Sequence, residues 1–468
     1  MQLTADCNLY STASKGMFKF GFDLDDADID NDIDSFLQQA DDLPGVRTSP
    51  RKDFGKRGQE NSESIVSGED GRFVELTMEH LLDALPTQLS YSPLEIPLSS
   101  SSTATPSAFS EPNLASGSQV HYLARRDLFD ARFQVISEDS GDPNFVAEAE
   151  NTEEKTERIA ASVDPRLQFL DTPSDLVPGV YEGGMKTWEC SLDLVDYLHA
   201  SLKDGDLEGK RVLELGCGTG IPSLYLLQKI FSLPSTESVL ERSAIHLQDY
   251  NPSALELVTF PNVLLTWYMS PASDTFLSSQ ASSPDAETDE ILEYPAKYPT
   301  NAGELIITPA LKDAFKQSLE KYNVELRFLG GSWKSFENAI GTGTHSRDSQ
   351  TQDASEGSLG GYDILLTSET IYRTESFPEL IHAMWQSTHP STSSSCPSSK
   401  LSQLTISEPR PPRILVAAKV FYFGVGGGVD EFAEAVRRWN GASGVKTEVT
   451  TVWEKNVGVG RRIIQVVW

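Results

Sequence analysis

The fold is decided by the stretch Arg211-Val212-Leu213-Glu214-Leu215-Gly216-Cys217-Gly218-Thr219-Gly220. A short apolar run enters three alternating glycines, and a second apolar run, residues 221–230, follows at once. This order is typical of a buried strand, a tight glycine turn and a helix. Glycine adopts positive φ and lets a ligand approach the backbone, while the start of a helix offers free N–H groups. The sequence therefore predicts a cofactor-binding loop.

The residues around these glycines indicate which cofactor binds. A dinucleotide site needs glycine or alanine three residues after the second glycine, where this chain has Ile221. Glu214 lies two residues before the first glycine, and its carboxylate would repel a pyrophosphate but attract a cation. S-adenosylmethionine carries an ammonium and a sulfonium, so the sequence favours this cofactor. An ordinary strand-to-helix turn is the alternative.

An acidic residue follows the next apolar run. Residues 244–248 lead into Asp249, Tyr250 and Asn251, which precede Pro252. An acid at the tip of the second strand binds ribose hydroxyls in nucleotide-binding sheets, so we predict that role for Asp249. The same residues also fit the start of a helix, and both roles can hold together.

Composition limits the function classes. The chain of 468 residues has a formal net charge of −31 and four scattered cysteines. It lacks the basic balance that nucleic-acid binding needs and suits a basic protein partner. No disulfide framework or zinc spacing is visible, so we expect no metal. Without a signal peptide or a long apolar span, we expect a soluble intracellular monomer. The basic pairs 51–52 and 56–57 fit a nuclear localisation signal, so we expect the protein in both the cytoplasm and the nucleus.

Residues 1–157 have the composition of a mostly disordered region. Residues 23–34 hold seven aspartates and no base, and Ser, Thr and Pro dominate residues 98–118. Such segments bury too little apolar surface to fold. Phe18, Phe20 and Phe22 alternate within the first segment, which fits either a short docking strand or a chance cluster.

Residues 165–468 alternate between strand and helix patterns. Low-complexity segments near 270–301, 341–360 and 388–412 are interpreted as surface loops. The predicted strands are Val212–Leu215, Ile245–Asp249, Val324–Leu329, Ile364–Thr367, Ile414–Ala418, Thr447–Val452 and Ile463–Val467, and the predicted helices are Ile221–Ile230, Leu311–Tyr322, Phe377–Trp385 and Glu431–Trp439. This order predicts an α/β fold, a Rossmann-like seven-strand sheet with helices on both faces. The short gap 454–461 makes the last two strands antiparallel.

Further motifs resemble those of one family, the histidine protein methyltransferases. The similar segments are Tyr181-Glu182-Gly183-Gly184-Met185-Lys186-Thr187-Trp188-Glu189-Cys190-Ser191-Leu192-Asp193-Leu194, Gln248-Asp249-Tyr250-Asn251, Gly331-Ser332-Trp333, Thr367-Ser368-Glu369-Thr370-Ile371-Tyr372 and Tyr422-Phe423-Gly424-Val425-Gly426-Gly427-Gly428-Val429. The last is the most specific, because related lysine methyltransferases lack it. The resemblance covers about residues 177–468, apart from the three low-complexity segments. It implies methyl transfer from S-adenosylmethionine to one histidine of a large-subunit ribosomal protein, the one numbered three.

The resemblance also implies a cofactor pocket. Its residues would be Thr187, Trp188, Glu189, Cys190, Ser191, Glu214, Gly216, Gly218, Gly220, Asp249, Tyr250, Asn251, Gly331, Ser332, Trp333 and Ser368. The three alternating glycines would cradle the methionine part, and Glu214 would face its amino group. Adenine would lie beside Trp333. Both Trp188 and Trp333 also fit an ordinary place in the core.

Glu369 and Tyr372 fit an acid-x-x-aromatic signature of methyltransferases that act on proteins. They follow a predicted strand and should lie at the ligand-binding edge of the sheet. A histidine side chain, with a pKa near ~6.5, is largely neutral in cells and has one nitrogen lone pair free to attack. We predict that Glu369 binds the opposite ring N–H and later takes its proton, while Tyr372 holds the ring. A carboxylate that stabilises a helix dipole is the alternative for Glu369.

Three functions remain open on the sequence alone. The first is a protein-histidine methyltransferase, in which the loop 421–429 would recognise the substrate backbone. The second is a lysine methyltransferase of the same fold, against which the run Gly426-Gly427-Gly428 argues. The third is a non-catalytic escort for a basic ribosomal protein, which would use the acidic residues 23–34.

Overall fold

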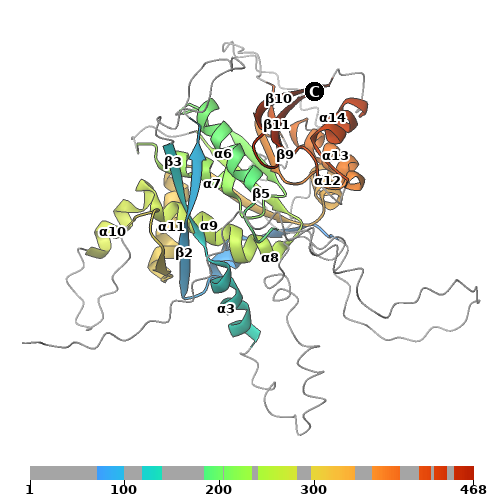
Figure 1. The fold of residues 1–468 in the computed structure, drawn as a ribbon. Coiled ribbons are helices and arrows are strands. Elements are labelled where there is room, and N and C mark those ends of the chain that lie inside the picture. The colour runs from blue at the N-terminus through green and yellow to red at the C-terminus, as the bar shows by residue number, and fades with distance from the viewer. Residues whose placement is uncertain are drawn as a thin grey trace, which may run out of the picture. The chain divides into compact units, whose positions relative to one another are not determined.

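The apolar run before the glycines, β4 (Arg211–Leu215), lies at the centre of an eight-stranded sheet in the computed structural model. Figure 1 shows this fold, with four strands of the sheet, β5, β9, β11 and β10, labelled. The order across this sheet is β1-β7-β5-β4-β8-β9-β11-β10. Besides β4, it contains β1 (Val74–Leu76), β5 (Ser243–Asp249), β7 (Val324–Gly330), β8 (Ile364–Ser368), β9 (Arg413–Lys419), β10 (Glu448–Lys455) and β11 (Arg461–Val467). β7, β5, β4, β8 and β9 run parallel, whereas β10 and β11 pair antiparallel, as predicted. All seven predicted strands are present, but the sheet has eight strands instead of the predicted seven, because the sequence did not predict β1.

The structure describes residues 71–99, 119–139, 184–203, 205–234, 241–281, 297–342, 361–389, 411–422, 426–439 and 447–468. All of them belong to one compact unit, Ser67–Trp468. The predictions made for the aromatic residues 18–22, the acidic run 23–34 and the basic pairs 51–52 and 56–57 lie outside the described residues. None of the described helices is long and apolar enough to cross a membrane.

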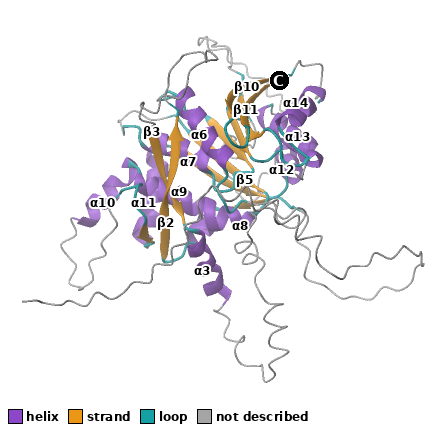
Figure 2. Cartoon of the chain, in the orientation of Figure 1, coloured by secondary structure: helices purple, strands orange, loops and turns teal. Residues whose placement is uncertain are grey.

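Helices cover both faces of the large sheet, as predicted (Figure 2). One face carries α6 (Glu189–Ser201), α7 (Ile221–Phe231), α8 (Pro252–Ala254), the π-helical turn η1 (Leu255–Thr259), α9 (Phe260–Met269) and α11 (Pro309–Lys321). The other carries α12 (Trp333–Thr342), α13 (Phe377–Thr388), which follows the short turn η3 (Thr374–Ser376), and α14 (Val429–Arg438). Strand side chains alternate between the two cores, so Val212 packs into the first and Leu213 into the second.

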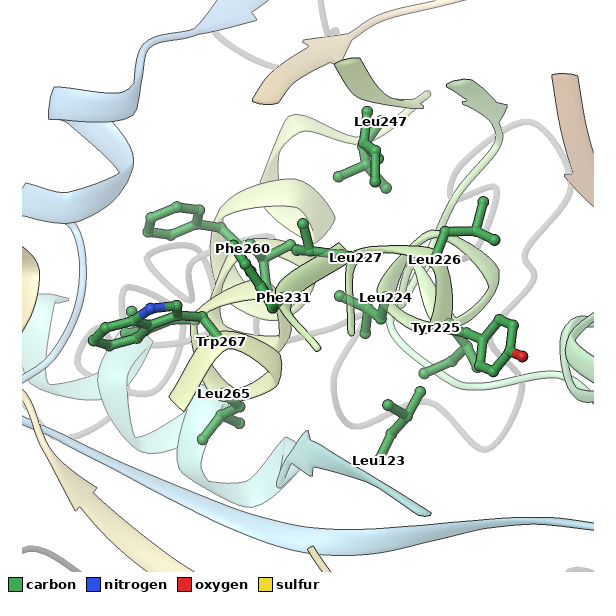
Figure 3. Close-up of a cluster of buried hydrophobic side chains, with 14 of the residues drawn as sticks. Leu123, Leu224, Tyr225, Leu226, Leu227, Phe231, Leu247, Phe260, Leu265 and Trp267 are labelled. Carbon is green, nitrogen blue, oxygen red and sulfur yellow. The ribbon is translucent and has the colours of Figure 1, made fainter. Parts of the chain in front are cut away.

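A second sheet, of three antiparallel strands, packs on the outside of the first helix layer. It consists of β2 (Gln88–Leu98), β3 (Gln119–Arg126) and β6 (Gly303–Ile306), in the order β3-β2-β6. β3 packs against α9, and β2 packs against α6. Figure 3 shows the resulting core, in which side chains of α7 and α9 lie between Leu247 of β5 and Leu123 of β3. Two further helices, α2 (Met78–Asp83) and α3 (Leu128–Asp139), flank these strands.

This second sheet corrects the prediction that residues 1–157 are mostly disordered, which is wrong for 71–99 and 119–139. The buried residues of β2, Leu89, Tyr91, Ile96 and Leu98, are interleaved with Ser, Pro and other residues that lower the mean hydropathy of the segment. β6 pairs only with residues 88–91 of β2. Two prolines, at 93 and 97, therefore lie where that edge of β2 is unpaired, a position that tolerates a missing N–H.

The three low-complexity segments also begin or end in regular structure. The first was predicted as a loop near 270–301, but η2 (Pro271–Ser273) and α10 (Asp274–Ala281) open it, and Phe276 is buried. Lys297 then returns to this turn and donates to the Ser270 carbonyl at 2.6 Å. α12 and α13 extend to Thr342 and Thr388, so the rest of the second and third segments lies outside the described residues, apart from a few flanking positions.

Candidate active site

The glycine loop after β4 has the backbone that the sequence predicts. Gly216, Gly218 and Gly220 all have positive φ, between +50° and +75°. A Cβ atom on Gly216 would lie 2.5 Å from Cγ2 of Thr370, so the loop excludes any side chain at that position. Its conformation is fixed by hydrogen bonds from neighbouring elements. The loop is thus a rigid cradle at the carboxyl end of the central strand.

Glu214 lies fully buried under this loop. Its Oε2 accepts hydrogen bonds from the Ser223 N–H at 3.0 Å and from the Ser223 hydroxyl at 2.5 Å. Its Oε1 is buried, and no described residue donates a hydrogen bond to it. Burial raises the pKa of Glu214 to about 8, against the opposing effect of both Ser223 hydrogen bonds. An orphaned carboxylate oxygen of this kind fits a cationic ligand such as the ammonium group of S-adenosylmethionine.

Asp249 connects the ends of β4 and β5. Its Oδ2 accepts from the Gly218 N–H at 2.8 Å, and its Oδ1 accepts from the Asn251 N–H at 2.9 Å. The carboxylate is therefore fixed beside the glycine loop, where a ribose ligand is expected. Asn251 is the N-cap residue of α8, although its side chain makes no capping hydrogen bond. Tyr250, also a predicted cofactor residue, is 44% exposed.

The predicted adenine loop lies against the same strand ends. Gln248 joins it to the glycine loop, because its amide donates to the Gly331 carbonyl at 2.7 Å and accepts from the Gly216 N–H at 3.3 Å. A Cβ on Gly216 would lie 3.9 Å from the Trp333 ring. The Ser332 N–H donates to the carbonyl of Gly71 at 2.8 Å, so the segment before β1 also touches this loop.

The segment before α6 passes over the glycine loop. Thr187 donates a hydrogen bond to the Thr219 hydroxyl at 3.2 Å, and Trp188 occupies the N-cap position of α6. Lys419, at the end of β9, holds its ammonium 5.4 Å from the centroid of the Trp188 ring. Glu189 forms an ion pair with Arg461 at 2.6 Å. The Ser191 hydroxyl donates to the Trp188 carbonyl at 2.6 Å, so Glu189 and Ser191 have protein partners that hold the start of α6.

Glu369 follows β8 with φ of +56°, a conformation that is rare for a residue with a side chain. The Tyr422 hydroxyl donates to its Oε2. Burial raises the pKa of Glu369, against the effect of Lys419 and of the neighbouring Cys190 and Tyr422 groups. Its Oε1 is buried, and no described residue makes a well-formed hydrogen bond to it. The Cys190 thiol and backbone N–H lie beside this carboxylate and lower its pKa, so Oε1, unlike that of Glu214, has donors close to it.

Two neighbours of Glu369 have raised pKa values. Burial raises the pKa of the Cys190 thiol well above its usual range, and the Glu369 carboxylate beside it adds to this effect. Burial and Glu369 likewise raise the pKa of Tyr422. Both groups therefore stay protonated at neutral pH and can donate to the carboxylate. The sequence placed Tyr422 in a substrate-recognition loop and did not single out Lys419. The interactions of these two residues with Glu369 were therefore not predicted.

The alternative role for Glu369, a carboxylate at a helix start, does not agree with the structure. The next helix, α13, begins at Phe377 after η3, and the field of a helix end acts mainly within its first turn. Glu369 instead lies with Ser368 at the end of β8, on the edge of the sheet that also carries the glycine loop.

The glycine run of the loop 421–429 packs against Tyr372. A Cβ on Gly427 would lie 2.4 Å from the backbone of residues 371 and 372, and the Gly427 N–H donates to the Tyr372 carbonyl at 3.1 Å. The rings of Tyr372 and Tyr422 are 6.3 Å apart. This close packing explains why glycine is needed at 427, and it holds Tyr372 near Tyr422, the residue that donates to Glu369. Residues 423–425 lie outside the described residues.

No family model matches the chain, but curated relatives do. It is 31% identical over 316 residues to Histidine protein methyltransferase 1 of Saccharomyces cerevisiae, an alignment that covers 66% of this chain and 67% of the relative. It is 27% identical over 352 residues to the protein of the same name from Schizosaccharomyces pombe, covering 72% and 78%. The chain belongs to the histidine protein methyltransferase family. The enzyme therefore transfers a methyl group from S-adenosylmethionine to a protein, as the sequence motifs predicted.

Among solved structures, the rRNA methyltransferase aviRa from Streptomyces viridochromogenes is 15% identical, with a TM-score of 0.29 over 63% of this chain and 91% of that chain. Assignments in this histidine protein methyltransferase therefore rest on its own geometry. That geometry brings Glu214, the glycine loop, Asp249 and the adenine loop together at one sheet edge, with Glu369 beside them. Within the described residues, no group of three or more histidine, cysteine or acidic side chains could hold a metal ion.

Proposed function

We propose that this enzyme methylates a ring nitrogen of a single histidine in a basic large-subunit ribosomal protein. Bound S-adenosylmethionine would supply the methyl group on its sulfonium. The net charge of −31 supports a basic protein partner, because opposite charge speeds the encounter. The observation that carries the chemistry is the buried carboxylate of Glu369: its Oε2 accepts from Tyr422, and its Oε1 has no well-formed hydrogen bond.

Glu369 would select one tautomer of the substrate. Its Oε1 would accept the N–H of the substrate ring, which leaves the lone pair of the other nitrogen directed toward the cofactor. As the methyl group passes to that nitrogen, S-adenosylhomocysteine would leave and positive charge would grow on the ring. The carboxylate would stabilise this charge and then take the N–H proton. Tyr422 fixes the opposite oxygen and so holds the carboxylate in place. Holding the ring in this orientation can contribute several kcal/mol to the barrier.

The first experiment identifies the acceptor. Purified enzyme and labelled S-adenosylmethionine would be mixed with ribosomal proteins from cells that lack this chain, and labelled peptides sequenced by mass spectrometry. We expect label on one histidine of a basic large-subunit protein. Label on lysine would overturn the histidine assignment. Label only on a small-subunit protein would overturn the proposed substrate, and no label despite tight cofactor binding would favour the escort function.

The role of Glu369 has its own test. Glu369→Gln keeps the shape of the side chain but replaces one accepting carboxylate oxygen with an amide N–H₂ group, which donates. We therefore expect turnover to fall by roughly 100-fold or more. S-adenosylhomocysteine affinity should stay unchanged, which separates chemistry from cofactor binding. Tyr422→Phe removes only the hydroxyl and should have a smaller effect, about tenfold. Unchanged turnover in Glu369→Gln would rule out the proposed role.

We also propose that the enzyme acts as a monomer, without binding nucleic acid directly, in the cytoplasm and nucleus, where ribosomal proteins are made and assembled. The acidic balance of the chain supports the first part. Sedimentation of the purified protein, with and without RNA, and microscopy of the tagged full chain would test these statements. A sedimenting dimer, an RNA complex at physiological salt, or exclusion from the nucleus would each contradict one of them.

A further inference from the structure

Two carbonyl groups of the glycine loop are held by a single helical segment. The Thr259 hydroxyl donates to the Gly218 carbonyl at 2.6 Å, and the Asn262 amide donates to the Thr219 carbonyl at 3.1 Å. Both side chains are 0% exposed. Because a peptide unit is planar, fixing each carbonyl also fixes the direction of the following N–H. Thr259 therefore sets the direction of the Thr219 N–H, and Asn262 sets that of the Gly220 N–H, which closes the turn onto the Cys217 carbonyl at 2.8 Å.

The segment that carries these two side chains is irregular, and the cause is a proline. Pro261 has no N–H, so it cannot donate to the Leu257 carbonyl as the residue four positions later would in an α-helix. The chain instead forms the π-helical turn η1, in which the Phe260 N–H donates to the Leu255 carbonyl. Such turns often occur at functional sites. Here the widened turn precedes Asn262 and includes Thr259, the two residues that hold the loop.

The carbonyl that Pro261 leaves without its helical donor receives one from the N-terminal sheet. Nη1 of Arg126, the last residue of β3, donates to the Leu257 carbonyl at 2.7 Å. The backbone N–H of Arg126 also donates to Oδ1 of Asn262 at 2.8 Å. Arg126 is 1% exposed, and Asp130 binds its Nε at 2.7 Å. A chain of direct hydrogen bonds thus runs from β3 through the irregular helix to the glycine loop.

We propose that Arg126, Thr259 and Asn262 are positioning residues for S-adenosylmethionine binding. The three-stranded N-terminal sheet is then part of the cofactor machinery, although none of its strands carries a predicted cofactor ligand. β3 is linked to the loop through this helix, and the proposed effect on the cofactor passes through these three side chains. The proposal rests on the family's cofactor and is independent of the substrate.

The first test changes one hydroxyl. Thr259→Val is nearly isosteric and removes the donor to the Gly218 carbonyl, while Thr259→Ser keeps the donor. We expect S-adenosylhomocysteine, measured by calorimetry, to bind roughly tenfold more weakly to the valine variant and within about twofold of normal to the serine variant. The KM for S-adenosylmethionine should rise similarly, with kcat at saturating cofactor unchanged. A valine variant with a lower melting temperature but normal affinity would show a purely structural role and overturn the proposal.

The second test acts at a distance. Arg126→Met fills the same volume without donors, and Arg462→Met is the matched control, because Arg462 pairs with Glu454 and Asp430 on the far β10–β11 edge. We expect the first variant to bind S-adenosylhomocysteine roughly fivefold more weakly than the wild type, and the control to bind it with unchanged affinity. If Arg126→Met folds, shown by a cooperative melt, and binds the cofactor normally, the N-terminal sheet has no part in cofactor binding. If Arg126→Met fails to fold, the same binding measurement is made on Asn262→Asp. This variant keeps the oxygen that accepts from the Arg126 N–H and loses the amide group that donates to the Thr219 carbonyl.

Discussion

Residues 211–249 and residues 71–126 meet at the same glycine loop but differ in how they act on it. The first region supplies Glu214, the glycines and Asp249, which face the expected cofactor directly. The second supplies β2 and β3, which pack on the outer side of the helices, and β3 is linked to the loop through Leu257 and Asn262. The ligand-facing groups lie within one short stretch of chain, whereas part of their support comes from β3, which ends 85 residues before β4 begins.

The largest expected effect tests whether the two regions share one core. Leu123 of β3 and Leu247 of β5 are both 1% exposed and belong to the same apolar cluster. Substituting either with alanine should lower the free energy of unfolding by about 2–5 kcal/mol, because each leaves a cavity. Urea unfolding of both variants measures this. Phe129→Ala, at a position that is 57% exposed, is the control and should cost well under about 1 kcal/mol. A Leu123→Ala variant as stable as the control would show that the N-terminal sheet folds separately.

The sequence predicted the elements whose pattern is local. β4 and the glycines, Glu214 and Asp249 form a motif within forty residues, and each strand of the parallel set is a short segment that contains several large apolar residues. β2 was missed because Ser and Pro separate its buried residues. Its partners β3 and β6 are also distant in the chain, and β6 follows it by about 200 residues. Pairing of that kind depends on tertiary packing, which composition does not reveal.

The same distinction explains which parts of the site were missed. The motif identified Glu369, but its bond to Tyr422 joins positions 53 residues apart in the chain. Asn262 and Thr259 resemble ordinary helix residues in the sequence, and only the folded chain brings them to the glycine loop. Pro261 was a visible signal, because a proline within an apolar helical run predicts a local irregularity.

The second prediction concerns the loop itself. In Gly216→Ala the new Cβ would lie 2.5 Å from Cγ2 of Thr370, and φ stays at +62°. We expect S-adenosylhomocysteine affinity to fall by roughly 100-fold, because backbone strain and the clash both oppose the bound loop. Gly458→Ala has equal strain at φ of +72° but nothing within 4 Å of its Cβ, in the β10–β11 hairpin. That control should bind normally, and a normal Gly216→Ala variant would contradict the rigid cradle.

The third prediction uses the pH dependence of Glu214, whose pKa rises from 4.5 to about 8 on burial. Below the lower value both folded and unfolded forms are protonated. As pH rises from 4.5 to about 8, the unfolded form releases its proton and the folded form keeps it, so the free energy of unfolding falls. Glu214→Gln should lose this decline, measured by urea unfolding at several pH values.

Cofactor binding should change in the opposite direction. A cationic amino group favours the ionised carboxylate, so binding of S-adenosylhomocysteine releases a proton and tightens as pH rises toward about 8. Calorimetry in buffers of different ionisation enthalpy measures that proton. Equal proton release by the wild type and Glu214→Gln would mean that another group binds the ammonium. The difference between the two proteins isolates Glu214 from Glu369, whose pKa is also raised.

The smallest expected effect lies where the N-terminal region touches the adenine loop directly. The Gly71 carbonyl accepts a hydrogen bond from the Ser332 N–H. Gly71 has φ of +44°, and a Cβ there would lie 2.7 Å from Cβ of Ser332. Gly71→Ala should move the segment before β1 away and weaken binding of S-adenosylhomocysteine about threefold to fivefold, because β1 stays paired with β7 through three residues.

Gly205→Ala controls for backbone strain alone, since φ there is +88° and nothing lies within 4 Å of the new Cβ. Adenosine as the ligand sharpens the result, because only contacts on the adenine and ribose side can change its affinity. An equal loss for adenosine and S-adenosylhomocysteine in Gly71→Ala assigns the effect to the adenine loop. A loss for S-adenosylhomocysteine alone would place it at the glycine loop, and the N-terminal region would then act on the cofactor only through the helix that carries Thr259 and Asn262.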